Sequence, residues 1–334
     1  MMNKIVELPL TEPLYRTYHR QGISGAILMD NPSIRNWYLN EVLILTCNRK
    51  FLSGFTTPEL DVLDSGWKSN PYFEKKKYPM QHLDGYIHYV IKKLLDQGYY
   101  VCFTGLDDYY VQGKSWYKEK HFSHDGAICG YNRENKTYCF YAYDSNWLYQ
   151  KFWTPQKCFD AGKKSIFKEG RYGFVCGIKT KNEEVAFSSG TALKKIAEYL
   201  DYSTNKFPEE ENGLVYGIAV HDFIAKYVMM LFDGSIPYDK MDRRIFRLIW
   251  EHKKVMLERI QRIELELHND STVSSNYVSL VNEANTIRML YASHHMKRRD
   301  SVLPIIHDKL LEIKNKETAL LKQLLISNVI GDNK

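Results

Sequence analysis

The sequence has no apolar run near the ~18 residues of a membrane-spanning helix, no block of lysine and arginine, and no CxxC motif. The first absence excludes a transmembrane span, and the second argues against a dedicated nucleic-acid-binding protein. Six cysteines without Cys/His ligand spacing make a zinc site unexpected and favour reduced thiols. Residues 1–16 contain Pro and Glu where a signal peptide needs an apolar stretch. We therefore expect a soluble, cytoplasmic protein with no cofactor.

Aromatic residues and a modest positive charge are what the chain does have. It contains 25 Tyr, 15 Phe and 6 Trp, and its formal net charge is +6. Amphipathic rings in this number suit a lined groove, although partly buried strands account for most of them. The charge is compatible with an acidic protein partner. A length of 334 residues is too long for one small core and favours two domains.

Hydrophobic periodicity changes along the chain and divides it into two parts. Helical patterns cover residues 31–47, where Asn31 is placed to cap and Pro32 to start the helix, and residues 82–97. Strand patterns follow at 99–106, 126–132, 137–144 and 172–180, and residues 133–136 read as a hairpin turn. From about residue 189 the pattern is helical almost to the end. The sequence predicts an α+β domain over 1–185 and an α-helical bundle domain over 186–334.

The stretch HFSHDGAICGYNRENKTYCFYAYDSNW, residues 121–147, contains the strongest candidate for chemistry. His124 precedes one predicted strand, and Asp144 follows its hairpin partner. Because the start of one hairpin strand lies beside the end of the other, we expect these two side chains to be neighbours. A carboxylate that fixes the ring and tautomer of an imidazole makes it a general base. A metal pair of His121 and His124 would lack a third ligand.

The segments SHDGAICGYN and YCFYAYDSNW resemble the histidine and asparagine strands of papain-like cysteine peptidases. The resemblance implies that His124 is the catalytic histidine and that Asp144 orients it. The segment RNWYLNEVLIL, residues 35–45, resembles the nucleophile helix of that superfamily, with Asn36 where the family has its cysteine. The expected substrate-binding residues are Asn36, Trp37, His121 and Trp147. Ser33 and Cys47 are weak candidates for a nucleophile.

The domain layout is similar to that of butirosin-type acyltransferases and their relatives in peptide natural-product clusters. That resemblance implies a transferase that forms an amide bond from a thioester on an acidic carrier protein, in biosynthesis of the nonribosomal-peptide type. An amine or peptide would accept the acyl group, and His124 with Asp144 would act as base. The alternative is a degenerate papain-like protein that binds a peptide or carrier protein.

Charged residues outside the hairpin have simpler interpretations. Asp107 and Asp108 are adjacent in a strand, so their side chains face opposite ways, and a loop cap or turn is favoured for them. The pair Arg243–Arg244 and the run 297–299 are typical of helix ends. They are also suited to meeting an acidic partner.

Overall fold

The structure is a computed structural model that describes residues 4–29, 31–54, 56–68, 70–146, 148–201, 213–268 and 272–329. Its elements are helices and antiparallel strands, which is an α+β fold. The chain forms two compact units. The first comprises Met1–Ile34 and Gly66–Glu184, and the second comprises Arg35–Ser65 and Val185–Lys334. The division after residue 184 is within one residue of the expected boundary, but residues 35–65 group with the helical unit.

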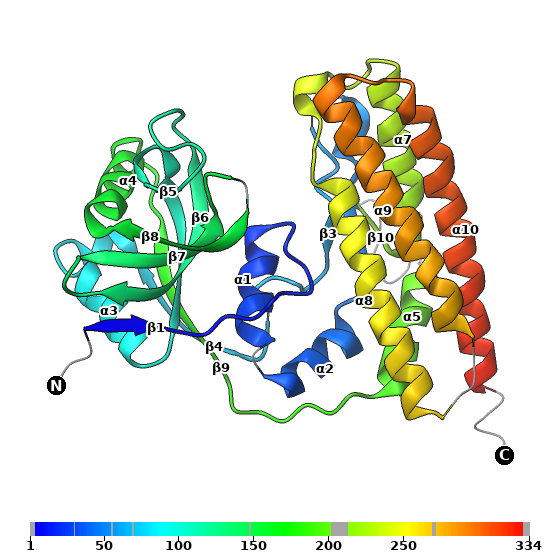
Figure 1. Cartoon of the computed structure of the whole chain (residues 1–334), viewed down its shortest axis with the longest axis horizontal. Coiled ribbons are helices and arrows are strands. Elements are labelled where there is room, and N and C mark those ends of the chain that lie inside the picture. The colour runs from blue at the N-terminus through cyan, green and yellow to red at the C-terminus, as the bar shows by residue number, and fades with distance from the viewer. Residues whose placement is uncertain are drawn as a thin grey trace. The chain divides into compact units, whose positions relative to one another are not determined.

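An antiparallel sheet organises the first unit (Figure 1). Its strand order is β4 (Phe73–Pro79), β9 (Phe174–Thr180), β5 (Tyr100–Asp107), β6 (Ser123–Asn132), β7 (Thr137–Tyr143) and β8 (Tyr149–Pro155), with β1 (Ile5–Glu7) also pairing with β6. The helices of this unit are α1 (His19–Leu28), α3 (Ile87–Asp96) and α4 (Gln156–Lys168). Short 3₁₀ turns add η2 (Met80–Leu83) and η3 (Asp108–Tyr110).

Apolar side chains of the central strands form the core of this unit. Phe103 of β5 and Phe140 of β7 are buried and lie 5.2 Å apart between ring centroids. Phe159 of α4 packs edge-on against Phe103 at 5.9 Å, and Ile91 of α3 belongs to the same cluster. These contacts remove the apolar faces of α3 and α4 from water, so the helices are fixed against the sheet.

The β6–β7 hairpin is formed as the sequence predicts. Its register pairs Ala127 with Tyr141 and Asn132 with Thr137. The Asn132 side chain accepts hydrogen bonds from the backbone N–H groups of Glu134 and Asn135, which closes the turn. The predicted strands at 99–106 and 172–180 correspond to β5 and β9.

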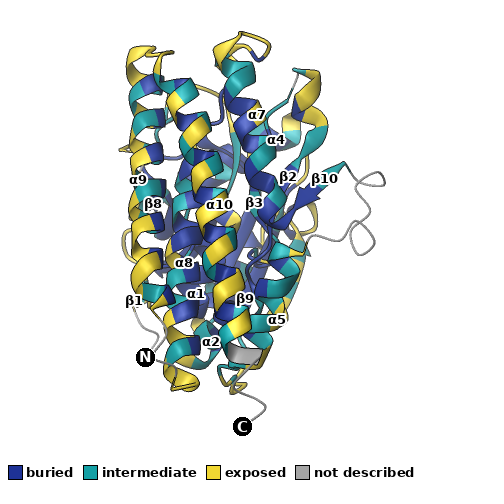
Figure 2. Ribbon diagram, turned by 90° about the vertical axis from the view of Figure 1, so that its right-hand side faces the viewer, coloured by how far each residue is buried: buried dark blue, intermediate teal, exposed yellow. Residues whose placement is uncertain are grey.

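Helices dominate the second unit. Most of α2 (Pro32–Glu41) lies in it, followed by α5 (Ser189–Leu200), α7 (Val220–Phe232), α8 (Ile245–Glu266), α9 (Val273–Lys297) and α10 (Val302–Val329). A small sheet of β10 (Leu214–Tyr216), β2 (Leu45–Asn48) and β3 (Asp61–Val62) accompanies them, with 3₁₀ turns η1 (Arg49–Ser53), η4 (Gly217–Ala219) and η5 (Tyr238–Lys240). α8 packs on α9, α9 on α10, and α10 on α7. Buried and exposed stripes alternate around α9 and α10 (Figure 2), as expected for amphipathic helices.

A buried polar network joins the helices of the bundle. Nζ of Lys253 on α8 lies 2.6 Å from Glu317 on α10, and both side chains are fully buried. The hydroxyls of Tyr277 and Tyr199 donate to Glu317 over 2.5 and 3.1 Å. Lys253 also donates to Nε2 of His221 on α7 over 3.0 Å. Each buried charge has several partners, so the network leaves no uncompensated charge. Its hydrogen bonds also specify how these helices align.

The helix predicted over residues 31–47 is shorter than expected. Asn31 does accept from the backbone N–H of Ser33, and α2 starts at Pro32, but it ends at Glu41. The buried guanidinium of Arg259 donates to the carbonyl oxygens of Tyr38, Leu39 and Val42 at this end. The following apolar run forms β2, since a short apolar run fits a buried strand as well as a helix.

Candidate functional site

His124 has a buried aspartate as its hydrogen-bond partner. Antiparallel pairing of β5 with β6 places Leu106 opposite His124, and η3 begins directly after β5 at Asp108. Nδ1 of His124 lies 3.1 Å from Oδ2 of Asp108. The histidine side chain is 29% exposed and the aspartate side chain 4%. A partly open imidazole is therefore held by a carboxylate that solvent barely reaches.

Lys114 compensates the charge of this carboxylate. Its Nζ lies 3.4 Å from Oδ1 of Asp108, and both side chains are buried. Burial lowers the pKa of Lys114, and the neighbouring Asp108 opposes that shift without reversing it. A carboxylate accepts hydrogen bonds only, so the proton of a neutral His124 sits on Nδ1 and the lone pair on Nε2. No group among the described residues forms a hydrogen bond with Nε2.

The start of α1 lies directly beside His124. The ring of His19, the first residue of α1, is 4.2 Å from the ring of His124 in an edge-on arrangement. Tyr143 and Tyr149 flank His19 at 5.2 and 5.3 Å. The hydroxyl of Tyr143 donates to the carbonyl oxygen of Thr17 over 3.2 Å, and that of Tyr149 donates to the carbonyl oxygen of His19 over 3.3 Å. Strands β7 and β8 thus fix the beginning of this helix against the histidine.

Asp144 does not hold His124, and the predicted hydrogen-bonded pair is wrong. Oδ1 of Asp144 accepts from the backbone N–H groups of Asn146 and Leu148, each over 2.8 Å. Its Oδ2 accepts from Nε2 of Gln150 over 2.6 Å. Burial acts to raise the pKa of Asp144, but these hydrogen bonds outweigh it and leave the pKa below its usual range. The residue shapes the connection from β7 to β8.

Asn36 and Trp37 belong to the second unit, whereas His124 belongs to the first. Nδ2 of Asn36 donates to the carbonyl oxygen of Val185 over 3.0 Å, and the ring of Trp37 packs edge-on against Tyr38 at 5.2 Å. Both positions stabilise α2. Within the first unit the helix beside His124 is α1, and the correspondence of residues 35–45 with a nucleophile helix stays a prediction.

The remaining predicted positions are Cys47, Ser33 and Trp147. Cys47 is buried in strand β2, and burial raises its pKa to about 12, with the charge of Arg49 opposing the shift. Ser33 lies in the first turn of α2. Trp147 lies outside the described residues. All six cysteines of the chain are buried free thiols.

His121 forms a second histidine–aspartate pair next to the first. Its Nδ1 lies 2.7 Å from Oδ2 of Asp107, the neighbour of Asp108. Two consecutive aspartates thus hold two histidines that are three residues apart. Asp107 also accepts from the backbone N–H of Tyr109 and so caps η3, as a loop-cap interpretation predicts. The available signal was an Asp-Asp pair at the end of a strand, followed by His-x-x-His at the start of the next.

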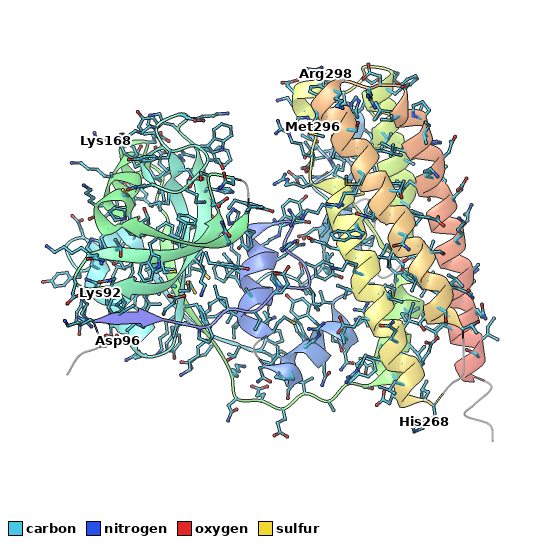
Figure 3. The ribbon with its side chains drawn as sticks, in the orientation of Figure 1. Lys92, Asp96, Lys168, His268, Met296 and Arg298 are labelled. Atoms are coloured by element: carbon cyan, nitrogen blue, oxygen red, sulfur yellow. The ribbon has the colours of Figure 1, made fainter. Side chains whose placement is uncertain are left out.

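The two basic clusters of the sequence belong to the second unit, one in the loop before α8 and one at the end of α9. Arg244 is paired with Asp242 over 2.9 Å, and the guanidinium of Arg298 lies 3.2 Å from the ring centre of Tyr238. The hydroxyl of Tyr238 contacts Nδ1 of His295 over 2.8 Å. These contacts connect the loop before α8 to the end of α9, where Figure 3 shows Arg298 and Met296.

Within the described part of the chain, no group of three or more His, Cys, Asp or Glu side chains is placed to hold a metal ion. No helix of that part is long and apolar enough to cross a membrane. Searches among protein families and among curated proteins give no match to this chain.

Proposed function

We propose that this protein transfers an acyl group from a thioester to an amine, with His124 as the general base and Asp108 as the residue that orients it. The observation that carries this proposal is the 3.1 Å contact between Nδ1 of His124 and the buried carboxylate of Asp108. It fixes the ring and leaves Nε2 as the basic nitrogen of a partly exposed side chain.

The reaction needs one proton acceptor and an activated donor. Nε2 of His124 takes a proton from the amine while the amine nitrogen attacks the thioester carbonyl carbon. The new C–N bond forms, the C–S bond breaks, and the departing thiolate receives the proton from the imidazolium. The carboxylate of Asp108 stabilises the imidazolium between these steps. A thioester is already activated, so alignment and base catalysis suffice without a covalent acyl-enzyme.

The cysteines support a direct transfer of this kind. All six are buried. Burial is the largest cause of the raised pKa values of Cys102 and Cys176, which favours their protonated form. A thiol in that state is a poor nucleophile. Iodoacetamide is therefore expected to leave transfer largely intact.

The donor and the fold family remain part of the proposal. The resemblance to butirosin-type acyltransferases implies a donor carried on an acidic carrier protein in natural-product biosynthesis. An antiparallel sheet that carries His124, with a helix starting beside it, supports a papain-like arrangement of the first unit. The alternative, a papain-like protein that binds a peptide or carrier protein without chemistry, is favoured by the absence of an exposed thiol.

Substitution of the pair, with a matched histidine as control, tests the proposal. His88 contacts Asp160 over 2.9 Å and is 32% exposed, close to the exposure of His124. With an N-acetylcysteamine thioester and an amine acceptor, we expect His124→Gln to slow transfer by about 10²–10⁴-fold. Asp108→Asn should also slow it, and His88→Gln should not. Unchanged transfer by a folded His124→Gln variant would remove the base from the mechanism and favour the binding protein.

A further inference from the structure

An exposed histidine beside the proposed base is held as firmly as the base itself. The side chain of His121 is 58% exposed, whereas that of its partner Asp107 is 2% exposed. The two are 2.7 Å apart. A histidine this exposed usually gains little from an ion pair, because solvent screens the interaction.

Both carboxylate oxygens of Asp107 accept hydrogen bonds. Its Oδ2 accepts from His121 and from Oγ of Ser165, each over 2.7 Å, and its Oδ1 accepts from the backbone N–H groups of Tyr109 and Phe122, each over 3.1 Å. Burial acts to raise the pKa of Asp107, but the hydrogen bonds, led by His121 and Ser165, leave it lowered. The aspartate is an ionised anchor, and its geometry fixes His121.

Stacking fixes the same imidazole from a second side. The ring of Tyr109 lies 4.2 Å from the ring of His121, at an angle of 21° between the planes. Holding an exposed side chain in one rotamer costs conformational entropy. A ring fixed by both a buried anchor and a stacking partner is therefore preorganised for contact with a ligand.

Phe122 continues this aromatic surface to His124. Its side chain is 42% exposed, although phenylalanine is usually buried. Its ring lies 5.1 Å from the ring of His124, edge-on at 76°. An exposed phenyl group next to the proposed base offers an apolar contact for whatever the base acts on.

We propose that His121, Tyr109 and Phe122 bind an aromatic ring of the acceptor, so that the acceptor is an amine that carries such a ring and whose nitrogen reaches His124. This inference rests on the proposed function. Because Nδ1 of His121 faces Asp107, its Nε2 is left to form a hydrogen bond with a second polar group of the ligand. The acceptor class is thus an amine that carries a planar ring and a further hydrogen-bonding group.

Binding of two matched amines tests the inference without turnover. Benzylamine and cyclohexylmethylamine have similar size and charge, but only the first has an aromatic ring. By ligand-observed NMR on the full chain, we expect benzylamine to bind about two- to tenfold more tightly, as expected for one aromatic contact. Phe122→Leu keeps an apolar side chain but should remove most of this preference. Tyr86→Leu, which changes an exposed ring elsewhere in the same unit, should retain it.

The possible outcomes separate this inference from the proposed function. The inference that His121, Tyr109 and Phe122 bind an aromatic ring would be wrong in any of three cases. The two amines bind equally, neither binds at millimolar concentration, or Phe122→Leu leaves the preference unchanged. If transfer nevertheless depends on His124, the proposed function stands. If Phe122→Leu removes the preference for benzylamine while a folded His124→Gln variant transfers normally, the ring-binding inference is supported and His124 is not the base.

Discussion

Two aspartates follow the strands on either side of β6, and they have different roles. Asp108 follows β5 and holds the imidazole of His124, whereas Asp144 follows β7 and holds the chain that turns into β8. The first has one histidine and one lysine as partners. The second has two backbone N–H groups and a side-chain amide. Their substitution should therefore affect different properties of the protein.

Asp144→Asn is expected to lower stability and leave transfer intact. The new Nδ2 would meet the amide donor of Gln150, and hydrogen bonds to a charged acceptor contribute about 1.5–3 kcal/mol each. Because the folded pKa of Asp144 is lowered, its contribution is present above the unfolded value of about 3.9 and is lost as pH falls through the folded pKa. Urea denaturation of wild type and variant between about pH 2 and 7 should show the difference shrinking with acid. Loss of transfer at unchanged stability would instead return Asp144 to the catalytic role.

The part of the site that depends on pairing within the β6–β7 hairpin could be predicted from the sequence. His124 and an acid beside it follow from the pattern, but the acid was assigned by hairpin register alone. The β6–β7 register does carry position 144 towards position 124. Yet the Asp144 side chain turns to the 146–150 segment, and no pattern shows that choice. Asp108 directly follows β5, and the sequence does not specify the path of the connection that leads from there to β6.

At the scale of elements, α1 is the segment whose placement the site depends on most. Its sequence HRQGISGAIL contains two glycines, which lower helix propensity. The sequence pattern therefore does not predict this helix. The structure supplies the reason for one of them. A Cβ on Gly22 would run into the ring of Tyr149, the same ring that packs against His19. The glycine allows β8 to approach α1 closely.

Gly22→Ala is expected to displace α1 and to destabilise the protein by about 1–3 kcal/mol, as overpacking of a filled core does. Gly190→Ala is the matched control, since this α5 glycine has no neighbouring atom closer than 4.0 Å to an added Cβ. It should be neutral or stabilising by up to about 1 kcal/mol. Thermal denaturation of the two variants gives the comparison. Equal effects of the two changes would show that α1 is not held against the ring.

Other elements show where propensity and periodicity succeed. The helical region after residue 189 and the hairpin of β6 and β7 are formed as predicted, because each has a long, regular pattern. The end of α2 was not predictable, because the group that terminates it is Arg259, which follows far along the chain. Tertiary contacts of this kind decide whether a short apolar run forms a helix or a strand, and the run that forms β2 is an example.

At the scale of the whole molecule, the charge bears on the proposed partner. The formal net charge is +6. In the second unit, Arg243 is exposed in the loop before α8, Lys297 is exposed as the last residue of α9, and Arg299 is exposed in the loop that follows. Arg244 and Arg298 in the same loops are occupied by Asp242 and Tyr238, which makes them parts of the fold. A charge-reversal experiment should therefore change the first three and keep the other two.

We expect the triple variant R243E/K297E/R299E to bind an acidic carrier protein more weakly than wild type, chiefly through a slower association rate. Added salt should weaken wild-type binding, because the Debye length falls from about 10 Å at 0.1 M to about 3 Å at 1 M. The control K194E/K226E/K322E makes the same change of charge at exposed lysines of the same unit. If both triple variants lose binding equally, net charge steers the carrier and the loops are no docking surface.

If transfer from a free thioester is as fast as from the carrier, and neither variant alters it, the carrier has no part in the reaction. A loss confined to the loop variant, with transfer from the free thioester retained, would locate the carrier on these loops and separate docking from the chemistry at His124.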